Sequence, residues 1–248
     1  MEHGYCFVSI SPVRADQKDQ SEIVTQLLFG EIVTIEEFNS PWMKITSIAD
    51  NYSGWVDHKH IKKLSNKEVR RWSEGLSHSK DRERLIQTPW GKQWISRGSF
   101  VPELEGSFNI GNDQYAWLEP TKESFDDIWS CAQTYLNTPY LWGGKSPFGI
   151  DCSGFTQAVY RFFGINLPRD ASQQVEDGTE VDFEDQQMGD LAFFESDNGK
   201  ITHVGILDNE GHIIHASGHV RMDILSQQGI VNSDTGILTH KLATIKRW

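Results

Sequence analysis

The chain has 248 residues, a length that predicts one large domain or two small ones. Its 9 Trp and 13 Phe supply bulky apolar material for a buried core, although the apolar fraction is only 38%. The net charge of −12 argues against binding to nucleic acid or to an anionic membrane surface, because both need clustered cations.

Further sequence features bear on the cellular compartment. No run of about 18 apolar residues predicts a transmembrane helix. The first residues lack the basic and apolar regions of a signal peptide, so we expect a cytoplasmic protein. The 3 cysteines have no CxxC spacing, which fits a reducing compartment and predicts neither a disulfide framework nor a cysteine-rich zinc site. We expect Cys6 and Cys131 to be buried apolar residues.

Residues 1–64 predict a small all-β barrel, because short β-rich runs alternate with Gly, Asn, Pro and Asp. The predicted strands are 5–9, 31–38, 42–45 and 54–56. The segment also resembles a bacterial SH3 domain. The residues that carry this resemblance are Val13-Arg14, Ser21 to Gln26, Gly30-Glu31 and Tyr52 to Val56.

Residues 65–120 give a weaker pattern. The stretch 65–85 is charged and has a helical or linker character, and short strands are predicted at 92–95, 98–101 and 115–118. We interpret this region as a linker plus a second, degenerate SH3-like domain, or equally as an extension packed on its neighbours. A boundary is predicted near Pro120.

Residues 121–248 predict an α+β domain, since helices come first and an antiparallel sheet follows. A helix is expected from Ser124 to about Asn137, and a second from Asp151 to Gly164, separated by a glycine-containing loop. Asp170 and Gln173 form a capping-box pattern. The predicted strands are 191–194, 203–207 and 211–217, with a hairpin turn at 208–211.

Cys152 is the candidate nucleophile, because it opens a predicted helix whose N-terminus favours a thiolate. His203 begins an apolar strand and is the candidate base. His215, on the next strand of the predicted hairpin, is the candidate orienting residue. Such a trio is suited to acyl transfer through a thioester. The backbone N–H of Cys152 and the hydroxyl of Tyr140 are candidate helpers.

Cys152, His203 and His215 also allow a structural interpretation or a zinc site. An isolated cysteine or histidine is more often structural, but their setting here makes that reading the weaker one. A zinc site from the same three residues has suitable ligand types but lacks the usual short paired spacing. We therefore expect no metal and no organic cofactor.

Residues 121–248 resemble the NlpC/P60 cysteine peptidases, which have a papain-like α+β core. The matching motifs are Thr138 to Gly144, Asp151 to Phe155, Leu167 to Gln174, Met188 to Phe194, His203 to Ile206 and Ile214 to Ser217. The resemblance implies Cys152 as nucleophile, His203 as base and His215 as the third residue.

With an SH3-like segment in front, the chain resembles the γ-D-glutamyl-L-diamino acid endopeptidases of the dipeptidyl-peptidase VI type. That resemblance implies a cell-wall peptide substrate, L-Ala-γ-D-Glu followed by L-Lys or meso-diaminopimelate, with a free N-terminal L-Ala. It implies that Glu22 and Tyr52 of the SH3 domain help to hold the substrate and that Asp170 meets the L-Ala ammonium. The further residues implied to line the pocket are Tyr140, Asp151, Ser153 and Arg169.

The leading hypothesis is a monomeric cytoplasmic peptidase that recycles cell-wall peptides. The first alternative is a secreted hydrolase that binds intact peptidoglycan through its SH3 domains. A non-catalytic wall-binding protein is disfavoured by the intact trio of Cys152, His203 and His215. An acyltransferase on the same core stays open, because only the fate of the thioester differs.

Overall fold

The computed structural model describes residues 1–103 and 105–248, which divide into two compact units. The first unit is Met1–Ser124 and the second is Phe125–Trp248. The domain boundaries expected at residues 64 and 120 stay a prediction. Each unit is described by itself.

The first unit is almost entirely β. Its elements are β1 (Glu2–Cys6), β2 (Ile10–Arg14), β3 (Ile23–Leu28), β4 (Ile32–Asn39), β5 (Trp42–Ser47), β6 (Ser53–Asp57), η1 (His58–His60), β7 (Ile61–Leu64), α1 (Asn66–Ser73), β8 (Leu76–His78), β9 (Glu83–Thr88), β10 (Gly91–Ser96), β11 (Phe100–Pro102), β12 (Ser107–Ile110) and β13 (Asp113–Trp117).

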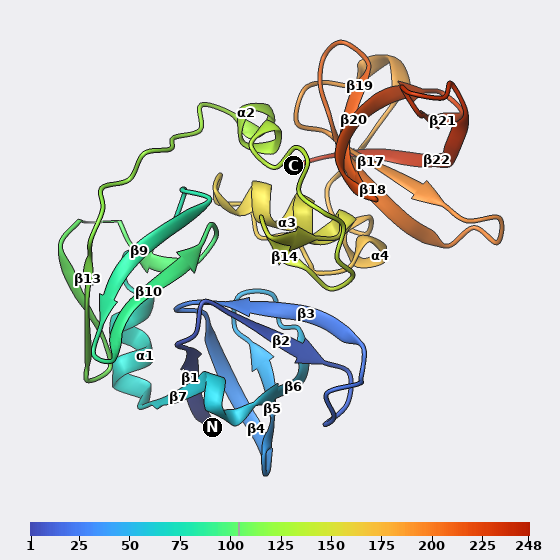
Figure 1. Cartoon of the computed structure of the whole chain (residues 1–248). Helices are drawn as coiled ribbons and strands as arrows, with labels where there is room; N and C mark the ends of the chain where they lie inside the picture. Colours follow the sequence, from blue (N-terminus) through green and yellow to red (C-terminus); the bar gives the residue numbers. More distant parts are fainter. Residues whose placement is uncertain (104) are drawn as a thin grey trace. The chain divides into compact units, whose positions relative to one another are not determined.

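Strands β1 to β7 form one antiparallel sheet in the order β3-β2-β6-β5-β4-β1-β7, and this sheet curls into a small barrel (Figure 1, blue to cyan). Apolar side chains alternate with polar ones along its strands, as in β5, where every second residue is buried. The buried residues meet inside the barrel and include Val13, Leu27, Val33 and Ile45. The predicted all-β barrel at the N-terminus is confirmed.

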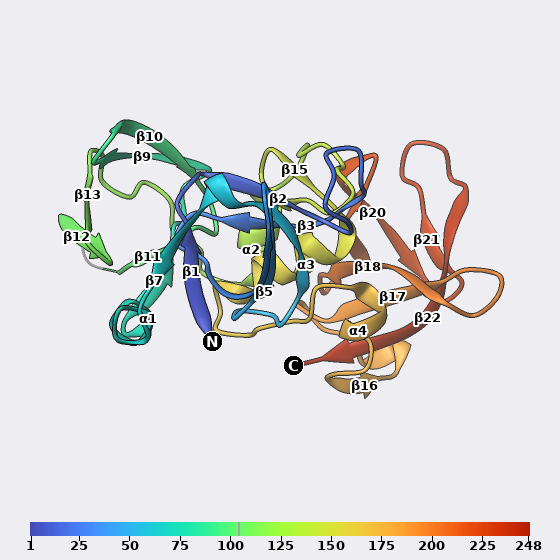
Figure 2. The same ribbon diagram turned by 90° about the horizontal axis from the view of Figure 1, so that it is seen from below.

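Residues 65–120 form a separate sheet that shares a core with the barrel. Ser65 caps α1 through a capping box with Glu68, and Trp72 is buried. The sheet has the order β10-β9-β13-β12, and Figure 2 shows these strands together near α1. One apolar cluster joins Tyr5 of β1 to Trp72 and Tyr115. The strand expected at 98–101 is displaced to β11, because Gly98 lies in a turn with φ 81°.

The second unit contains short helices and a strongly curved sheet. Its elements are α2 (Ile128–Gln133), β14 (Lys145–Ser146), β15 (Gly149–Ile150), α3 (Cys152–Arg161), α4 (Ala171–Gln174), β16 (Thr179–Val181), η2 (Phe183–Asp185), β17 (Leu191–Glu195), β18 (Ile201–Leu207), β19 (His212–Ser217), β20 (His219–Ser226), β21 (Gly229–Val231) and β22 (Leu238–Arg247).

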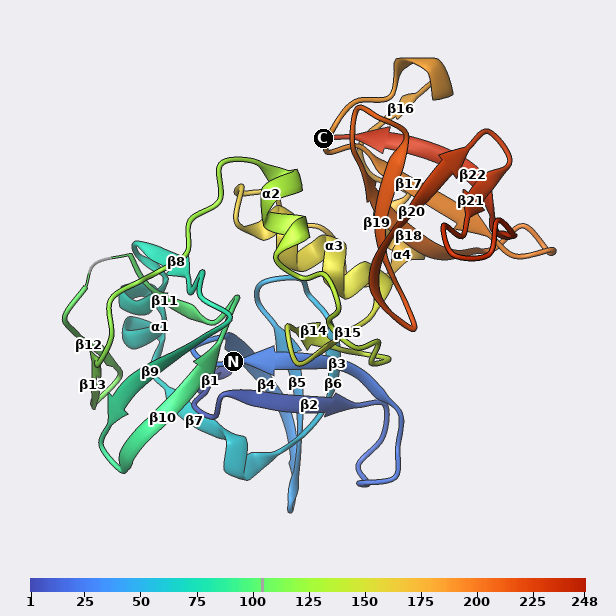
Figure 3. The same ribbon diagram turned by 45° about the horizontal axis from the view of Figure 1, so that its top comes forward.

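The sheet of the second unit has the order β16-β22-β17-β18-β19-β20-β21, and β21 also pairs with β22. The strands from β17 to β22 therefore close on themselves, and Figure 3 shows their curvature. Successive side chains of β17 point to opposite faces of the sheet. Phe194 packs in the apolar cluster between the strands, and its neighbour Phe193 packs in the cluster that includes the helices. Helix α3 packs against β18 and β19 through that second cluster. The predicted α+β catalytic domain is confirmed.

Two predicted helices are shorter than expected. Helix α2 begins at Ile128, because Asp127 rather than Ser124 accepts a hydrogen bond from the backbone N–H of Ser130 at 2.7 Å. Helix α3 ends at Arg161, before the predicted end at Gly164, which has φ 76°. Among the described residues, no helix is long and apolar enough to cross a membrane.

Candidate active site

Helix α3 places Cys152 in its first turn. Asp151 precedes the helix, and its Oδ1 accepts the backbone N–H of Gly154 at 2.7 Å. A Cβ on Gly154 would lie 2.2 Å from the carbonyl oxygen of Gly144, so glycine is required for the helix to approach this loop. The glycine-rich loop and α3 are thus packed backbone to backbone beside the thiol.

The Cys152 side chain is almost buried, with 7% of its surface exposed. Burial and then the charge of Asp151 raise the pKa of the thiol to about 12, although backbone N–H groups of Ser153 and Val204 act in the other direction. The helix N-terminus favours a thiolate, whereas burial favours the neutral thiol. A thiol whose pKa is raised in this way needs a base to take its proton.

The base and its partner come from two neighbouring strands. His203 lies on β18 and His215 on β19, and the antiparallel register pairs Gly205 with His215. A Cβ on Gly205 would lie 2.9 Å from the Cβ of His215, so glycine leaves room for that ring. Nε2 of His203 is 2.8 Å from Nδ1 of His215. The structure therefore brings together two of the residues that the sequence singled out.

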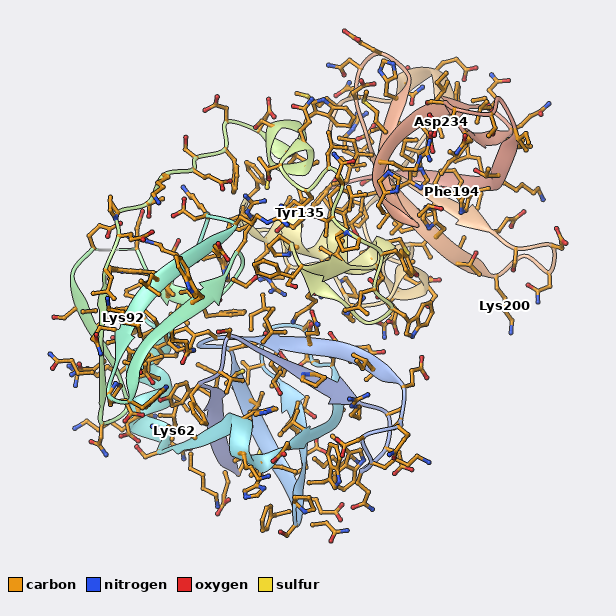
Figure 4. All side chains as sticks on the ribbon, in the orientation of Figure 1. Lys62, Lys92, Tyr135, Phe194, Lys200 and Asp234 are labelled. Carbon is orange, nitrogen blue, oxygen red and sulfur yellow. The ribbon has the colours of Figure 1, made fainter. Side chains whose placement is uncertain are left out.

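The His203 imidazole is neutral at pH 7. Burial, followed by the proximity of His215 and His240, holds its pKa well below the ordinary value of 6.5. His240 of β22 stacks on it, with ring centroids 4.2 Å apart. The ring of Phe194, which is labelled in Figure 4, has its centroid 5.8 Å from that of His203. A neutral, enclosed imidazole is able to accept the proton of a thiol.

Sequence reasoning missed Asp223, which lies behind His215. This carboxylate on β20 is only 1% exposed, and its Oδ2 is 3.0 Å from Nε2 of His215. Burial would raise its pKa, but hydrogen bonds from His215, Ser233 and Arg221 outweigh burial and hold the pKa well below its usual range. The order from the base inward is therefore His203, His215 and a charged Asp223.

Three of the predicted substrate-binding residues form a buried network. Arg169 donates to both carboxylate oxygens of Asp151, at 3.0 and 2.6 Å, and to the hydroxyl of Ser153 at 3.0 Å. The Arg169 side chain is only 1% exposed. The pair fixes the loop before α3, because Asp151 Oδ2 also accepts the N–H of Gly143 at 2.8 Å. A direct substrate contact of these residues stays a prediction.

Tyr140 and Asp170 lie elsewhere around the start of α3. The Tyr140 side chain is half-buried, and burial, followed by the charges of Cys152 and Asp151, raises the pKa of its phenol to about 12. Asp170 is partly exposed and precedes α4, and the Gln173 side chain accepts its backbone N–H, as the capping-box pattern predicted.

Glu22 and Tyr52 belong to the first unit. Glu22 is exposed immediately before β3, and its carbonyl accepts the N–H of Ala15 at 3.0 Å. Tyr52 is partly exposed before β6, and its carbonyl accepts the N–H of Ser47 at 2.9 Å. Both stand at defined turns of the barrel. Their role toward a substrate stays a prediction.

One cluster has donor atoms close enough for a metal. Single ligand atoms of Asp208, Glu210 and His212 lie within 4.8 Å of one another. The Asp208 carboxylate already accepts the backbone N–H groups of Glu210 and His212, both at 2.8 Å. These contacts close the turn between β18 and β19, so the cluster has a structural explanation.

A thiol in the first turn of α3 and a buried imidazole on β18, a strand that packs against α3, are the nucleophile and base that a cysteine peptidase requires. Residues 137–239 match the NlpC/P60 family, and residues 13–61 match the bacterial dipeptidyl-peptidase Sh3 domain. The chain therefore contains an NlpC/P60 peptidase domain, with a bacterial SH3 domain in front of it.

Relatives extend this similarity over most of the chain. A γ-D-glutamyl-L-lysine dipeptidyl-peptidase of Bacillus cereus is 29% identical over 233 residues, covering 79% of this chain and 68% of the relative. Dipeptidyl-peptidase 6 of Lysinibacillus sphaericus is 26% identical and covers 84% and 86%. The crystal structure of an NlpC/P60 family protein from Bacillus cereus shares the fold, with a TM-score of 0.80, 21% identity and 99% coverage of both chains.

Proposed function

We propose that the protein hydrolyses the bond between γ-D-Glu and the following L-diamino acid in cell-wall peptides that begin with a free L-Ala. The observation that carries this proposal is the similarity to a γ-D-glutamyl-L-lysine dipeptidyl-peptidase over 79% of the chain. It is supported by the pairing of an NlpC/P60 domain with a dipeptidyl-peptidase type of SH3 domain.

The first chemical step forms a thioester. His203 accepts the proton of the neutral Cys152 thiol as sulfur attacks the γ-carbonyl carbon of D-Glu. The resulting oxyanion is stabilised by the backbone N–H of Cys152, which has no acceptor within α3 because it lies in the first turn. The His203 imidazolium then protonates the amine of the diamino acid, the C–N bond breaks and the first product leaves.

The second step consumes one water molecule. His203 removes a proton from water as the water oxygen attacks the thioester carbonyl. The C–S bond breaks, and the proton returns from His203 to the sulfur of Cys152. L-Ala-γ-D-Glu is released and the neutral thiol–imidazole pair is restored.

Specificity for a free amine needs carboxylates that meet an ammonium. We assign this task to Asp170 and Glu22, with Tyr52 helping to hold the peptide. An N-acylated peptide would leave these acids without a cation, so its cleavage would be strongly disfavoured. Tyr140 is assigned to the nucleophile side of the pocket. The buried trio of Asp151, Ser153 and Arg169 shapes the wall behind it.

We further propose that the protein acts as a monomer in the cytoplasm on peptides already released from the sugar chains, which is a recycling role. The diamino acid is L-Lys or meso-diaminopimelate. The requirement for a free amine supports this role, because intact peptidoglycan attaches the L-Ala nitrogen to sugar through an amide.

The test is a set of peptides read by mass spectrometry. The set contains L-Ala-γ-D-Glu-L-Lys, its diaminopimelate analogue, the N-acetylated form of each, and purified sacculi. We expect L-Ala-γ-D-Glu to be released from the two free-amine peptides only. The Cys152→Ala variant serves as the control and should release none.

Two results would contradict the proposal. Equal cleavage of acetylated and free peptides would exclude recognition of the ammonium and favour hydrolysis of intact wall. Cleavage of sacculi alone would identify the protein as a wall hydrolase.

A further inference from the structure

Asp223 has two carboxylate oxygens with different partners. Oδ1 accepts the backbone N–H of Ser233 at 2.8 Å and a guanidinium N–H of Arg221 at 2.9 Å. Oδ2 is 3.0 Å from Nε2 of His215. The side chain lies on β20, where Asp223 pairs with Ile213 of β19, and it is buried. Its orientation is therefore fixed, with one oxygen reserved for His215.

The charge of Asp223 decides where His215 carries its proton. A carboxylate only accepts hydrogen bonds, so the facing nitrogen of His215, Nε2, must be N–H. With one ring proton, on Nε2, His215 has a bare Nδ1. That atom is 2.8 Å from Nε2 of His203, so His203 must donate and carries its proton on Nε2. Nδ1 of His203 is left as the unprotonated nitrogen.

The bare nitrogen of His203 is the one needed for catalysis. The backbone N–H of Val204, the residue after His203, donates a hydrogen bond to the Cys152 sulfur, so this stretch of β18 lies against the thiol. We propose that Asp223 is a positioning residue that fixes the tautomers of His215 and His203 and thereby leaves Nδ1 of His203 free to accept the thiol proton. The inference rests on the proposed function, because that reaction is where the base is used.

An asparagine at position 223 should reverse the whole relay. Its carbonyl oxygen must occupy the Oδ1 position, because two N–H donors, from Ser233 and Arg221, point at that position. Its NH₂ group would then face Nε2 of His215 and donate to it. His215 would carry its proton on Nδ1 and donate to His203, whose own proton would move to Nδ1. That nitrogen could no longer accept a proton from Cys152.

Other charged or titratable side chains lie near Asp223 and the two histidines. Arg221 lies between Asp223 and the exposed Asp234, whose Oδ2 is 2.7 Å away, and Asp234 is labelled in Figure 4. His240 stacks on His203 from β22, 5.7 Å from the His215 ring. Of these groups, Asp223 is the one whose side chain contacts Nε2 of His215. Asp234→Asn is therefore a matched control, since it removes a carboxylate from the same cluster without touching the relay.

The experiment compares Asp223→Asn, Asp223→Ala and Asp234→Asn in the full chain. Long-range proton–nitrogen spectra of ¹⁵N-histidine-labelled protein report which ring nitrogen of His203 and His215 is protonated. We expect Nε2–H on both in the wild type and in Asp234→Asn, and Nδ1–H on both in Asp223→Asn. We expect kcat of Asp223→Asn on L-Ala-γ-D-Glu-L-Lys to fall by roughly 10³-fold or more with little change in KM.

The alanine variant separates positioning from simple structural support. Alanine imposes no tautomer, so it should retain more activity than asparagine although it leaves a cavity and lowers stability more. A merely structural role predicts the opposite order, because asparagine preserves the shape and the Oδ1 contacts. The asparagine variant is nearly isosteric and is expected to fold.

Two outcomes would overturn the inference. One is a wild-type nitrogen spectrum in Asp223→Asn together with kcat within about three-fold of the wild type. The other is Nδ1–H on His203 in the wild type. Both readings of tautomer are made without substrate. A protein that failed to cleave the peptide would contradict the proposed function and leave the spectroscopic test of Asp223 intact.

Discussion

Burial disfavours the charged forms of both Cys152 and His203 in the free protein. The pKa of the thiol is raised to about 12 by burial and Asp151, and burial with two neighbouring histidines lowers that of the imidazole. These shifts disfavour an ion pair at rest, so charge should develop as sulfur attacks the substrate. The enclosed site then favours a reaction in which the proton moves directly from thiol to base.

These pKa shifts predict the pH dependence of kcat/KM. A lowered pKa means that His203 stays unprotonated below pH 6.5, so the acid limb should lie below that value. The alkaline limb should follow loss of the substrate's α-ammonium, near pH 8, because the thiol ionises far higher. Initial rates on L-Ala-γ-D-Glu-L-Lys between about pH 4 and 10 measure both limbs. An acid limb at or above pH 6.5 would show that the base is not the buried, neutral His203.

The residues of the trio were predictable from the sequence, and Asp223 was not. Cys152, His203 and His215 each lie in a sequence motif that resembles the family. Asp223 lies outside these motifs, so no neighbouring residues mark it as part of the site. Apolar alternation in Val220-Arg221-Met222-Asp223-Ile224 would place Met222 and Ile224 inward and the aspartate in solvent. The structure does the reverse, leaving Met222 44% and Ile224 47% exposed. A buried partner for His215 outweighs the local pattern.

At the scale of elements, the site depends on how α3 and β18 are fixed. The nucleophile stands at the first turn of α3, and the bases stand on adjacent strands of a sheet that closes on itself. Strand β18 pairs with β17 on one side and with β19 on the other, so the His203–His215 contact is held in register. The loop before α3 is held by the Arg169–Asp151 pair instead of by strands.

Removing the cation of that pair should be costly. We expect Arg169→Met to lower the free energy of unfolding by about 3–5 kcal/mol, because Asp151 would be left as a buried charge without its partner. Urea denaturation followed by circular dichroism measures the change. Lys241→Met is the matched control, since Lys241 pairs with Glu195 at the surface and its loss should cost far less than the loss of the buried pair. Equal losses in the two variants would contradict a structural role for the buried pair.

Element boundaries were less predictable than element types. Asp127 and Ser124 are both good capping residues, and only the packing of α2 decides that Asp127 is used. Strand β22 was missed because most of its residues are partly or fully exposed, so it has no strong apolar alternation. The sheet closes through pairing of β21 with β22, which connects residues that no local pattern links.

At the scale of the molecule, the chain combines an all-β unit with a catalytic unit. The first unit has its own apolar clusters, and residues 65–120 share one of them with the barrel. The SH3 match covers residues 13–61, so the later strands were hard to interpret from sequence. The apolar core of these strands includes Tyr5 of β1, and no local sequence pattern predicts a contact with so distant a residue.

The proposed role of the first unit in substrate selection is testable at Glu22. We expect Glu22→Gln to lower kcat/KM on free-amine peptide by roughly 10- to 100-fold, which corresponds to loss of a charge-assisted hydrogen bond. The N-acetylated peptide, which offers no ammonium, should be affected little. Steady-state kinetics measure both values, with Glu37→Gln on β4 of the same barrel as the control. If Glu22→Gln leaves the ratio of kcat/KM for the two peptides unchanged, Glu22 does not bind the substrate's ammonium.

The most direct measurement follows cleavage of L-Ala-γ-D-Glu-L-Lys in heavy-oxygen water by the wild type and by Cys152→Ala. We predict that the wild type places one heavy oxygen in the γ-carboxylate of L-Ala-γ-D-Glu and none in the released lysine, and that Cys152→Ala gives no product. Cleavage that persists in Cys152→Ala, or an intact peptide with the wild type, would contradict a Cys152-dependent γ-D-glutamyl peptidase.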